Sequence, residues 1–220
     1  MITCQLGHKT HDTKVVASQL GKLRVYDWDK YKDVIGYCPG KDDVSRTIAN
    51  TGAWASTETE YIGQVLANGD RNNLVIDFGA HIGWFTIFAA SYGYDVLAYE
   101  GNKFHAELLR ENIETNHLKR VEVVEQWIDD MTEQLVVFRE VELVKCDLEG
   151  AEAKAIRLIE LLLENKRVKN LFVEISPIFN DGYPALVEKI CKYGYDAFRN
   201  GVPFDGNFNF DQDDFLFVRR

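Results

Sequence analysis

The chain has 220 residues, a length that suits one domain and leaves no room for two full enzyme domains with a linker. Hydrophobic residues make up 46% and charged residues 27%, as in globular proteins, and no apolar run approaches the ~20 residues that span a bilayer. Without such a run we expect no membrane as a partner. The formal net charge of -10 opposes the phosphate backbone, so we expect no nucleic acid as a partner, although the charge leaves room for a local basic patch.

The start of the chain lacks the basic segment and apolar run of a secretory signal. The cysteines stand far apart and in no metal-ligand spacing: Cys4, Cys38, Cys146 and Cys191. Widely spaced cysteines of this kind are typical of reduced thiols in a reducing compartment. We therefore expect a soluble protein of the cytoplasm.

Residues 1–70 lack the regular alternation of strand and helix patterns seen in the rest of the chain and are interpreted as an N-terminal extension. Within it, residues 15–26 have a strand-like pattern, residues 36–43 a loop pattern and residues 57–66 a helical one. The extension leads directly into the first strand of the following domain. It is equally compatible with a packing appendage and with a cap over the mouth of a ligand site.

From about residue 74, short apolar runs rich in β-formers alternate with longer segments of helical period, which indicates βαβ units and a mainly parallel sheet. The predicted strands are residues 74–78, 95–99, 121–125, 142–146, 170–175, 195–199 and 215–219. The predicted helices are residues 82–92, 103–117, 151–165 and 183–193, and residues 127–139 are ambiguous.

The segment between the last two predicted strands, residues 201–214, is rich in Gly, Asn and Asp and too short for a crossover helix. These two strands should therefore form an antiparallel hairpin at one edge. The sequence thus predicts an α/β domain over residues 71–220, with a Rossmann-like fold and a seven-stranded, mostly parallel sheet.

The first of these strands ends in a glycine turn that opens a helix, the place where open α/β sheets bind ligands. The glycine spacing is not the three-glycine fingerprint that holds a pyrophosphate. Asp77, at the strand end, would repel a diphosphate but suits the ammonium group of S-adenosylmethionine (SAM). The residues of this turn that we expect to contact the cofactor are Asp77, Gly79, Ala80, His81, Gly83 and Trp84.

Glu100 ends the second predicted strand and follows Asp77 at close to the ~20-residue spacing seen in dinucleotide sites. A carboxylate there can accept both ribose hydroxyl protons, so the spacing supports an adenosine ligand. Gly101 and Asn102 follow directly, and Trp127 lies where an aromatic ring could stack on adenine. We include all four residues in the predicted cofactor site.

Carboxylates also follow the fourth and fifth predicted strands. Because adjacent parallel strands lie ~4.8 Å apart, we expect Asp147, Glu149 and Glu174 to converge beside the transferable methyl group. Methylation of a hydroxyl needs a base or a metal that acidifies the hydroxyl, and these three residues are the catalytic candidates. Asp147 and Glu174 would be the ligands if a divalent metal is bound. Glu152, by contrast, is interpreted as a cap of the following helix.

Together these motifs resemble the FkbM-type methyltransferases over residues 70–220. The segments that carry the resemblance are residues 77–83, Tyr99-Glu100 with the downstream Asn112 and Asn116, residues 143–152 and residues 172–177. The resemblance implies SAM as cofactor and a small hydroxylated acceptor, such as a sugar or a secondary metabolite. Two features depart from the family pattern: His81 stands where Asn is usual, and the interval before Lys145 is short.

Three alternatives to a hydroxyl-methylating enzyme stay open. The first is methylation of nitrogen or carbon, although Asp147-Leu-Glu149-Gly150 lacks the Pro-Pro-aromatic element that DNA amino methyltransferases use to hold a base. The second is a domain that binds SAM without catalysis. The third, a nicotinamide dehydrogenase, is disfavoured by Asp77 in the phosphate path. The sequence does not predict the oligomeric state.

Overall fold

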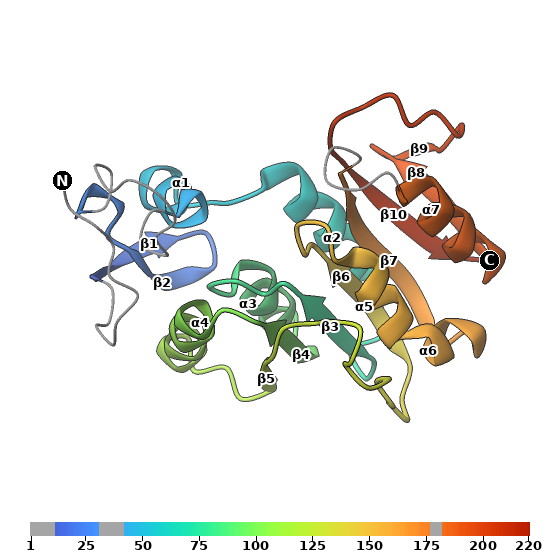
Figure 1. Cartoon of the computed structure of the whole chain (residues 1–220). Coiled ribbons are helices and arrows are strands. Elements are labelled where there is room, and N and C mark those ends of the chain that lie inside the picture. Colours follow the sequence, from blue (N-terminus) through green and yellow to red (C-terminus); the bar gives the residue numbers. More distant parts are fainter. Residues whose placement is uncertain (1–11, 31–41, 177–181) are drawn as a thin grey trace.

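The computed structural model describes residues 12–30, 42–176 and 182–220 (Figure 1). Most of the loop predicted at residues 36–43 therefore lies outside the described residues, as do Cys4, Cys38 and Pro177.

A mixed sheet forms the centre of the described chain, with strands in the order β5-β4-β3-β6-β7-β10-β8-β9. Strands β3 to β7 are all parallel, whereas β10 runs antiparallel to both β7 and β8. The strands are β3 (Leu74–Phe78), β4 (Asp95–Glu100), β5 (Val121–Glu125), β6 (Val141–Cys146), β7 (Val168–Ile175), β8 (Tyr195–Arg199), β9 (Val202–Pro203) and β10 (Asp213–Arg219).

The predicted α/β fold class is confirmed, and each predicted strand is present. Two details differ from the prediction. The two-residue strand β9 extends the sheet beyond the seven predicted strands. The strands β8 and β10 do pair antiparallel, but β10 inserts between β7 and β8, so that β8 and β9 form the edge.

Helices cover both faces of the sheet because alternate residues of each strand point to opposite sides. Val75 of β3 packs in one apolar cluster with α2 (Ser56–Asn68) and α3 (Trp84–Ser91). Its neighbour Ile76 packs in another cluster with α5 (Glu152–Leu158), α6 (Glu160–Glu164) and α7 (Tyr183–Lys192). Helix α4 (Lys103–Thr115) contacts β4 and β5. No helix of the described chain is long and apolar enough to cross a membrane.

Two segments after β5 differ from the sequence pattern. The predicted helix at 151–165 is two short helices, α5 and α6, which meet at Ile159. Residues 126–140 contain neither helix nor strand. Within this loop Phe138 is 91% exposed. Some apolar residues of the loop therefore lie on the surface and do not indicate a buried helix or strand.

The N-terminal segment packs on the central domain. A hairpin of β1 (Thr13–Ser18) and β2 (Gly21–Tyr26), followed by a short 3-10 turn (Trp28–Lys30), lies against α4. The buried amide of Asn112 on α4 donates to the carbonyls of Arg24 and Ile82, both at 2.9 Å. Helix α1 (Asp43–Thr51), which the sequence did not predict, begins after Asp42, whose carboxylate accepts from the backbone N–H groups of Val44 and Ser45.

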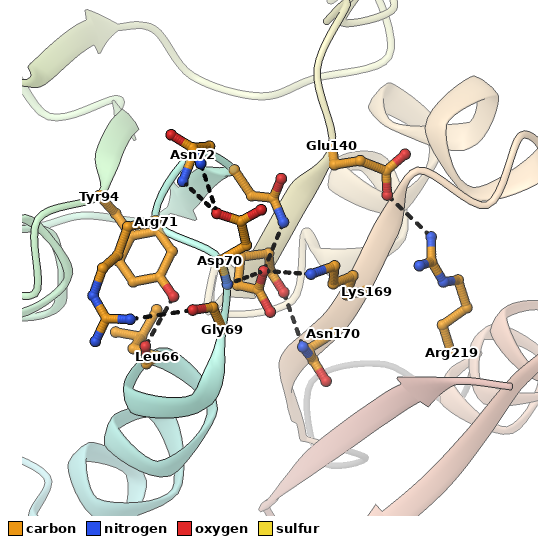
Figure 2. A network of polar contacts seen from close by, with 12 residues as sticks. Leu66, Gly69, Asp70, Arg71, Asn72, Tyr94, Glu140, Lys169, Asn170 and Arg219 are labelled. Atoms are coloured by element: carbon orange, nitrogen blue, oxygen red, sulfur yellow. Dashed lines mark hydrogen bonds and ion pairs between the residues drawn. The ribbon is translucent and has the colours of Figure 1, made fainter.

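Helix α2 links this segment to the sheet, and its far end is held by a polar network at the amino ends of the strands (Figure 2). The buried Glu142 accepts from the backbone N–H of Asp70, at 3.1 Å, and from the side chains of Asn73 and Lys169, at 2.7 and 2.9 Å. The hydroxyl of Tyr94 donates to the carbonyl of Leu66 at 2.8 Å. These bonds anchor the end of α2 before the chain enters β3.

Candidate functional site

A cavity of about 620 Å³ opens at the carboxyl ends of β3, β4, β5, β6 and β7. This volume lies in the ~300–1,000 Å³ range of small-molecule sites. The predicted site residues that line it are Gly79, Ala80, His81, Trp84, Glu100, Gly101, Asn102, Trp127, Asp147, Glu149 and Glu174. Asp77 and Gly83 are not among its lining residues.

Two glycines shape the turn after β3. Gly79 has φ +81°, and a β-carbon there would lie 1.9 Å from the carbonyl oxygen of Asp147. Gly83 has φ +100°, and a β-carbon there would lie 2.4 Å from Leu109 Cδ1 on α4. Gly79 therefore permits the close approach of two turns at the cavity, whereas Gly83 permits the packing of α3 against α4.

Asp77 faces the protein interior. Its side chain is buried, and one oxygen accepts from the Thr86 hydroxyl at 2.6 Å. The other oxygen lies 3.6 Å from the Lys145 ammonium. The ammonium group beside Asp77 in this structure therefore belongs to the protein itself, and a direct contact of Asp77 with the cofactor stays a prediction.

Glu100 is 7% exposed and lies at the cavity wall. The backbone N–H of His81 donates to Oε2 at 2.8 Å, and that of Asn102 donates to Oε1 at 2.7 Å. Burial raises the pKa of Glu100, and these two bonds act in the opposite direction. Because each carboxylate oxygen has two lone pairs, Glu100 can still accept from hydroxyls of a ligand.

The two tryptophans of the predicted site have different environments. Trp127 is 70% exposed, and its ring covers Gly101, where a β-carbon would lie 2.3 Å from Cδ2 of the indole. Trp84 is buried, and its Nε1 donates to the Thr59 hydroxyl at 2.9 Å. Trp127 therefore offers an accessible aromatic face, whereas Trp84 forms part of a packed wall.

His81 connects the turn to the N-terminal segment. Its Nε2 lies 3.3 Å from Asp42 Oδ1, and its ring centroid lies 4.0 Å from that of His105. Burial, together with the positive charge of Lys145, lowers the pKa of His81 to about 4. The imidazole is therefore neutral at pH 7 and too weakly basic to be a good proton acceptor.

The three predicted catalytic carboxylates lie together. One oxygen of each of Asp147, Glu149 and Glu174 lies within 4.8 Å of the others, an oxygen-only set that suits a hard divalent cation. Gln212 donates to Oε1 of Glu174, while Oε2 is buried and has no hydrogen-bond partner. Burial, with the charges of Asp147 and Glu149, raises the pKa of Glu174 to about 8. The carboxyl of Glu174 therefore holds a proton at pH 7.

Glu152 supports the loop that carries two of these carboxylates. It is 1% exposed and accepts from the backbone N–H groups of Leu148 at 2.9 Å and Gly150 at 3.1 Å. The hydroxyl of Tyr183 donates to its second oxygen. Glu152 is the first residue of α5, and both of these N–H groups precede the helix, so Glu152 holds the loop and does not cap the helix as predicted.

Several lining residues were missed as site residues by sequence reasoning: Asp42, Lys145, His105 and Gln212. A signal existed for Lys145, because a lysine is out of place in the apolar run of β6. Asp42 and Gln212 gave no such signal, since the tertiary fold alone brings them to the sheet edge.

Comparison with known proteins adds the fold relationship. No protein-family model matches the chain, and a search of curated proteins finds no match. An rRNA methylase from Streptococcus thermophilus matches with a TM-score of 0.54 at 14% identity, over 76% of this chain and 99% of that chain. A TehB-like SAM-dependent methyltransferase from Corynebacterium glutamicum matches with a TM-score of 0.53 at 14% identity, over 80% of this chain and 94% of that chain.

A Streptococcus mutans protein crystallised in complex with SAH, the demethylated product of SAM, matches with a TM-score of 0.52 at 17% identity, over 73% of this chain and 97% of that chain. Identities this low establish the fold alone. The chain has the class I fold of SAM-dependent methyltransferases.

The expectation that nucleic acid is excluded as a partner is wrong as an inference from charge. An rRNA methylase shares this fold over most of the chain. Net charge is a sum over the whole molecule, whereas contact with phosphates depends on the local surface. The charge of -10 therefore does not decide the class of acceptor.

Proposed function

We propose that this chain is an enzyme that transfers the methyl group of SAM to a hydroxyl of its acceptor, as its resemblance to FkbM-type methyltransferases implies. The observation that carries the proposal is the shared cavity. It brings Glu100, at the end of β4, together with the carboxylates that follow β6 and end β7.

In this proposal the cofactor lies between the turn after β3 and the loop after β5. Glu100 accepts from the ribose hydroxyls, and the exposed ring of Trp127 stacks on adenine. Gly79, Ala80 and His81 let the backbone approach the methionine part, while Asn102 holds Glu100 through its N–H. Trp84 lines the cavity, whereas Asp77 and Gly83 support its wall from behind.

The chemistry falls to the carboxylates. Asp147, whose side chain is 39% exposed, accepts the proton of the acceptor hydroxyl as the oxygen attacks the methyl carbon. The new C–O bond forms as the C–S bond breaks, and its electron pair stays on sulfur to give SAH. Glu174 is protonated at pH 7 and can donate a hydrogen bond to the acceptor; Glu149 completes the wall.

A divalent metal fits the same carboxylates. Asp147, Glu149 and Glu174 would hold it, and when bound it would acidify the acceptor hydroxyl. Chelation decides between the two versions, because a metal-dependent reaction stops with chelator and resumes with added cation.

We propose further that residues 1–70 form a cap over this cavity, with residues 71–220 as the methyltransferase domain. Asp42, Asp43, Val44 and Trp54 of the N-terminal segment line the cavity, which supports the cap. A cytoplasmic location is also proposed, since it suits the free thiols of Cys146 and Cys191 among the described residues.

The test is a pair of titrations followed by an acceptor screen. Calorimetry and thermal shift should show binding of SAH and no binding of NAD, and stabilisation by NAD alone would falsify the proposed class. Release of SAH is then measured with sugars, other hydroxylated compounds, amines and RNA, since a neighbour of this fold is an rRNA methylase. Transfer only to nitrogen or carbon would retain the methyltransferase and reject the hydroxyl acceptor.

A further inference from the structure

Lys145 is a buried cation in the wall of the cavity. It stands in β6, a strand whose residues are all buried, and it is 4% exposed. A charged side chain at such a position is costly unless its charge is compensated. Its surroundings therefore have to explain why the strand carries a lysine there.

Three oxygen groups surround the Lys145 ammonium. It donates to the carbonyl of Gly79 at 3.1 Å, and it lies 3.3 Å from Asp147 Oδ2 and 3.6 Å from Asp77 Oδ1. An ammonium has three N–H donors, and the bond to Gly79 uses one of them. The two nearby carboxylates compensate its charge. The negative charges of Asp147 and Asp77 beside the ammonium compensate its burial and favour the cation.

The same contacts join the two turns that meet at the cavity. The Asp147 backbone N–H donates to the Phe78 carbonyl at 3.2 Å, and the Asp147 carbonyl occupies the space beside Gly79. Lys145 adds a side-chain link between Gly79 and the Asp147 carboxylate. The Asp147 carboxylate, directly after β6, is therefore held by a cation of that strand.

Methyl transfer changes the charge beside this cation. SAM carries a sulfonium and its product SAH a neutral sulfur, and a reaction with Asp147 as base requires that sulfur to lie near Asp147. At separations of a few ångströms, unit charges in a partly buried site interact strongly enough to change affinity about tenfold or more.

Resting on the proposed function, we propose that Lys145 is a positioning residue that joins the turn after β3 to Asp147 and sets the preference of the cavity for SAM over SAH. With Lys145 present, its charge offsets that of Asp147, which limits the attraction for the sulfonium. Without Lys145 the negative charge of Asp147 is no longer compensated, and without Asp147 the positive charge of Lys145 is less compensated.

The experiment measures calorimetric affinities for SAM and for SAH and takes their ratio. Lys145→Met should raise the preference for SAM over SAH about tenfold, because Asp147 is left uncompensated. Asp147→Asn should lower the same preference several-fold, and Lys145→Arg, which keeps the charge, should return it toward the wild-type value. Should Lys145→Met fail to fold, the Asp147→Asn arm still tests the proposal, because that side chain is partly exposed.

The matched control is Lys169→Met. Lys169 lies near the amino end of the neighbouring strand β7 and pairs with the buried Glu142 at 2.9 Å. Neither residue lines the cavity. Lys169→Met should lose stability with no change in the ratio. If wild type binds both ligands but Lys145→Met weakens them equally, or Asp147→Asn leaves the ratio unchanged, the inference is overturned and the proposed function stands. If the wild-type protein binds neither SAM nor SAH, both the inference about Lys145 and the proposed function are rejected.

Discussion

The carbonyl oxygen of Asp147 lies 1.9 Å from the position that a β-carbon on Gly79 would occupy. The turn after β3 and the turn after β6 are therefore in direct backbone contact at the cavity. Any side chain at residue 79 must push the two turns apart, because a backbone carbonyl cannot rotate away as a flexible side chain can.

Gly79→Ala should therefore reduce both the free energy of unfolding and the affinity for SAH. The control is Gly93→Ala, which also has positive φ, at +90°, but nothing within 4 Å of the added β-carbon. Gly93→Ala should cost only the ~1–2 kcal/mol of left-handed strain. Denaturant unfolding and calorimetry compare the two, and equal losses would show that strain, not contact between the turns, matters at Gly79.

Glu100→Ala should weaken SAH binding by ~1–3 kcal/mol, because the ribose hydroxyls lose a charged acceptor. The variant also frees the N–H groups of His81 and Asn102, so part of the loss comes from the turn. Glu125→Ala is a suitable control, since Glu125 ends the adjacent strand β5 in an exposed pair with Arg110. Calorimetry that finds the affinity of Glu100→Ala unchanged would move the ribose contact elsewhere.

Trp127→Ala should weaken SAH by ~1–3 kcal/mol, the usual contribution of an aromatic ring stacked on a base. Its stability should change little, because the side chain is 70% exposed. Phe138→Ala, at a position 91% exposed in the same loop, controls for the loss of surface apolar area. Comparable losses of affinity in both variants would argue against adenine stacking on Trp127.

Asp214 predicts a pH-dependent stability. Burial, followed by the charge of Glu58, raises the pKa of Asp214 to about 7. A carboxyl whose folded pKa is raised stabilises the fold at low pH, and this stability is lost as pH rises from about 4 through 7. Asp214→Asn should therefore gain in Tm relative to wild type as pH increases from 5 to 8, by about 2–4 °C per kcal/mol. The control is Asp196→Asn, an exposed substitution on β8, whose Tm should follow that of wild type at every pH. If the Tm of Asp214→Asn also follows that of wild type, burial of Asp214 does not make stability depend on pH.

The elements that sequence reasoning located well are those with local signals. Strand β3, the glycine turn and helix α3 follow from an apolar run, two glycines and helical spacing. The ends of β4, β6 and β7 place Glu100, Asp147 and Glu174 at one edge once the sheet is parallel. Their convergence on one cavity could therefore be predicted.

The features that could not be predicted from the sequence depend on contacts between residues far apart in the chain. Helix α1 carries few apolar residues and is held by its Asp42 cap and by packing of Ile48. The insertion of β10 beside β7 is a choice of register that the turn sequence does not reveal. Lys145 gains its meaning only when Gly79 and Asp147 are brought to it by the pairing of β3 with β6.

Asp147→Asn tests most directly whether Asp147 accepts the proton of the acceptor during methyl transfer while Glu100 holds the cofactor. SAH affinity and methyl transfer from labelled SAM are measured in parallel, with an acceptor from the screen and with Asp130→Asn as an exposed control. SAH should still bind to Asp147→Asn within about tenfold of wild type, while turnover should fall by about 100-fold or more. Full turnover in Asp147→Asn would contradict these roles, as would a parallel loss of SAH binding and folding.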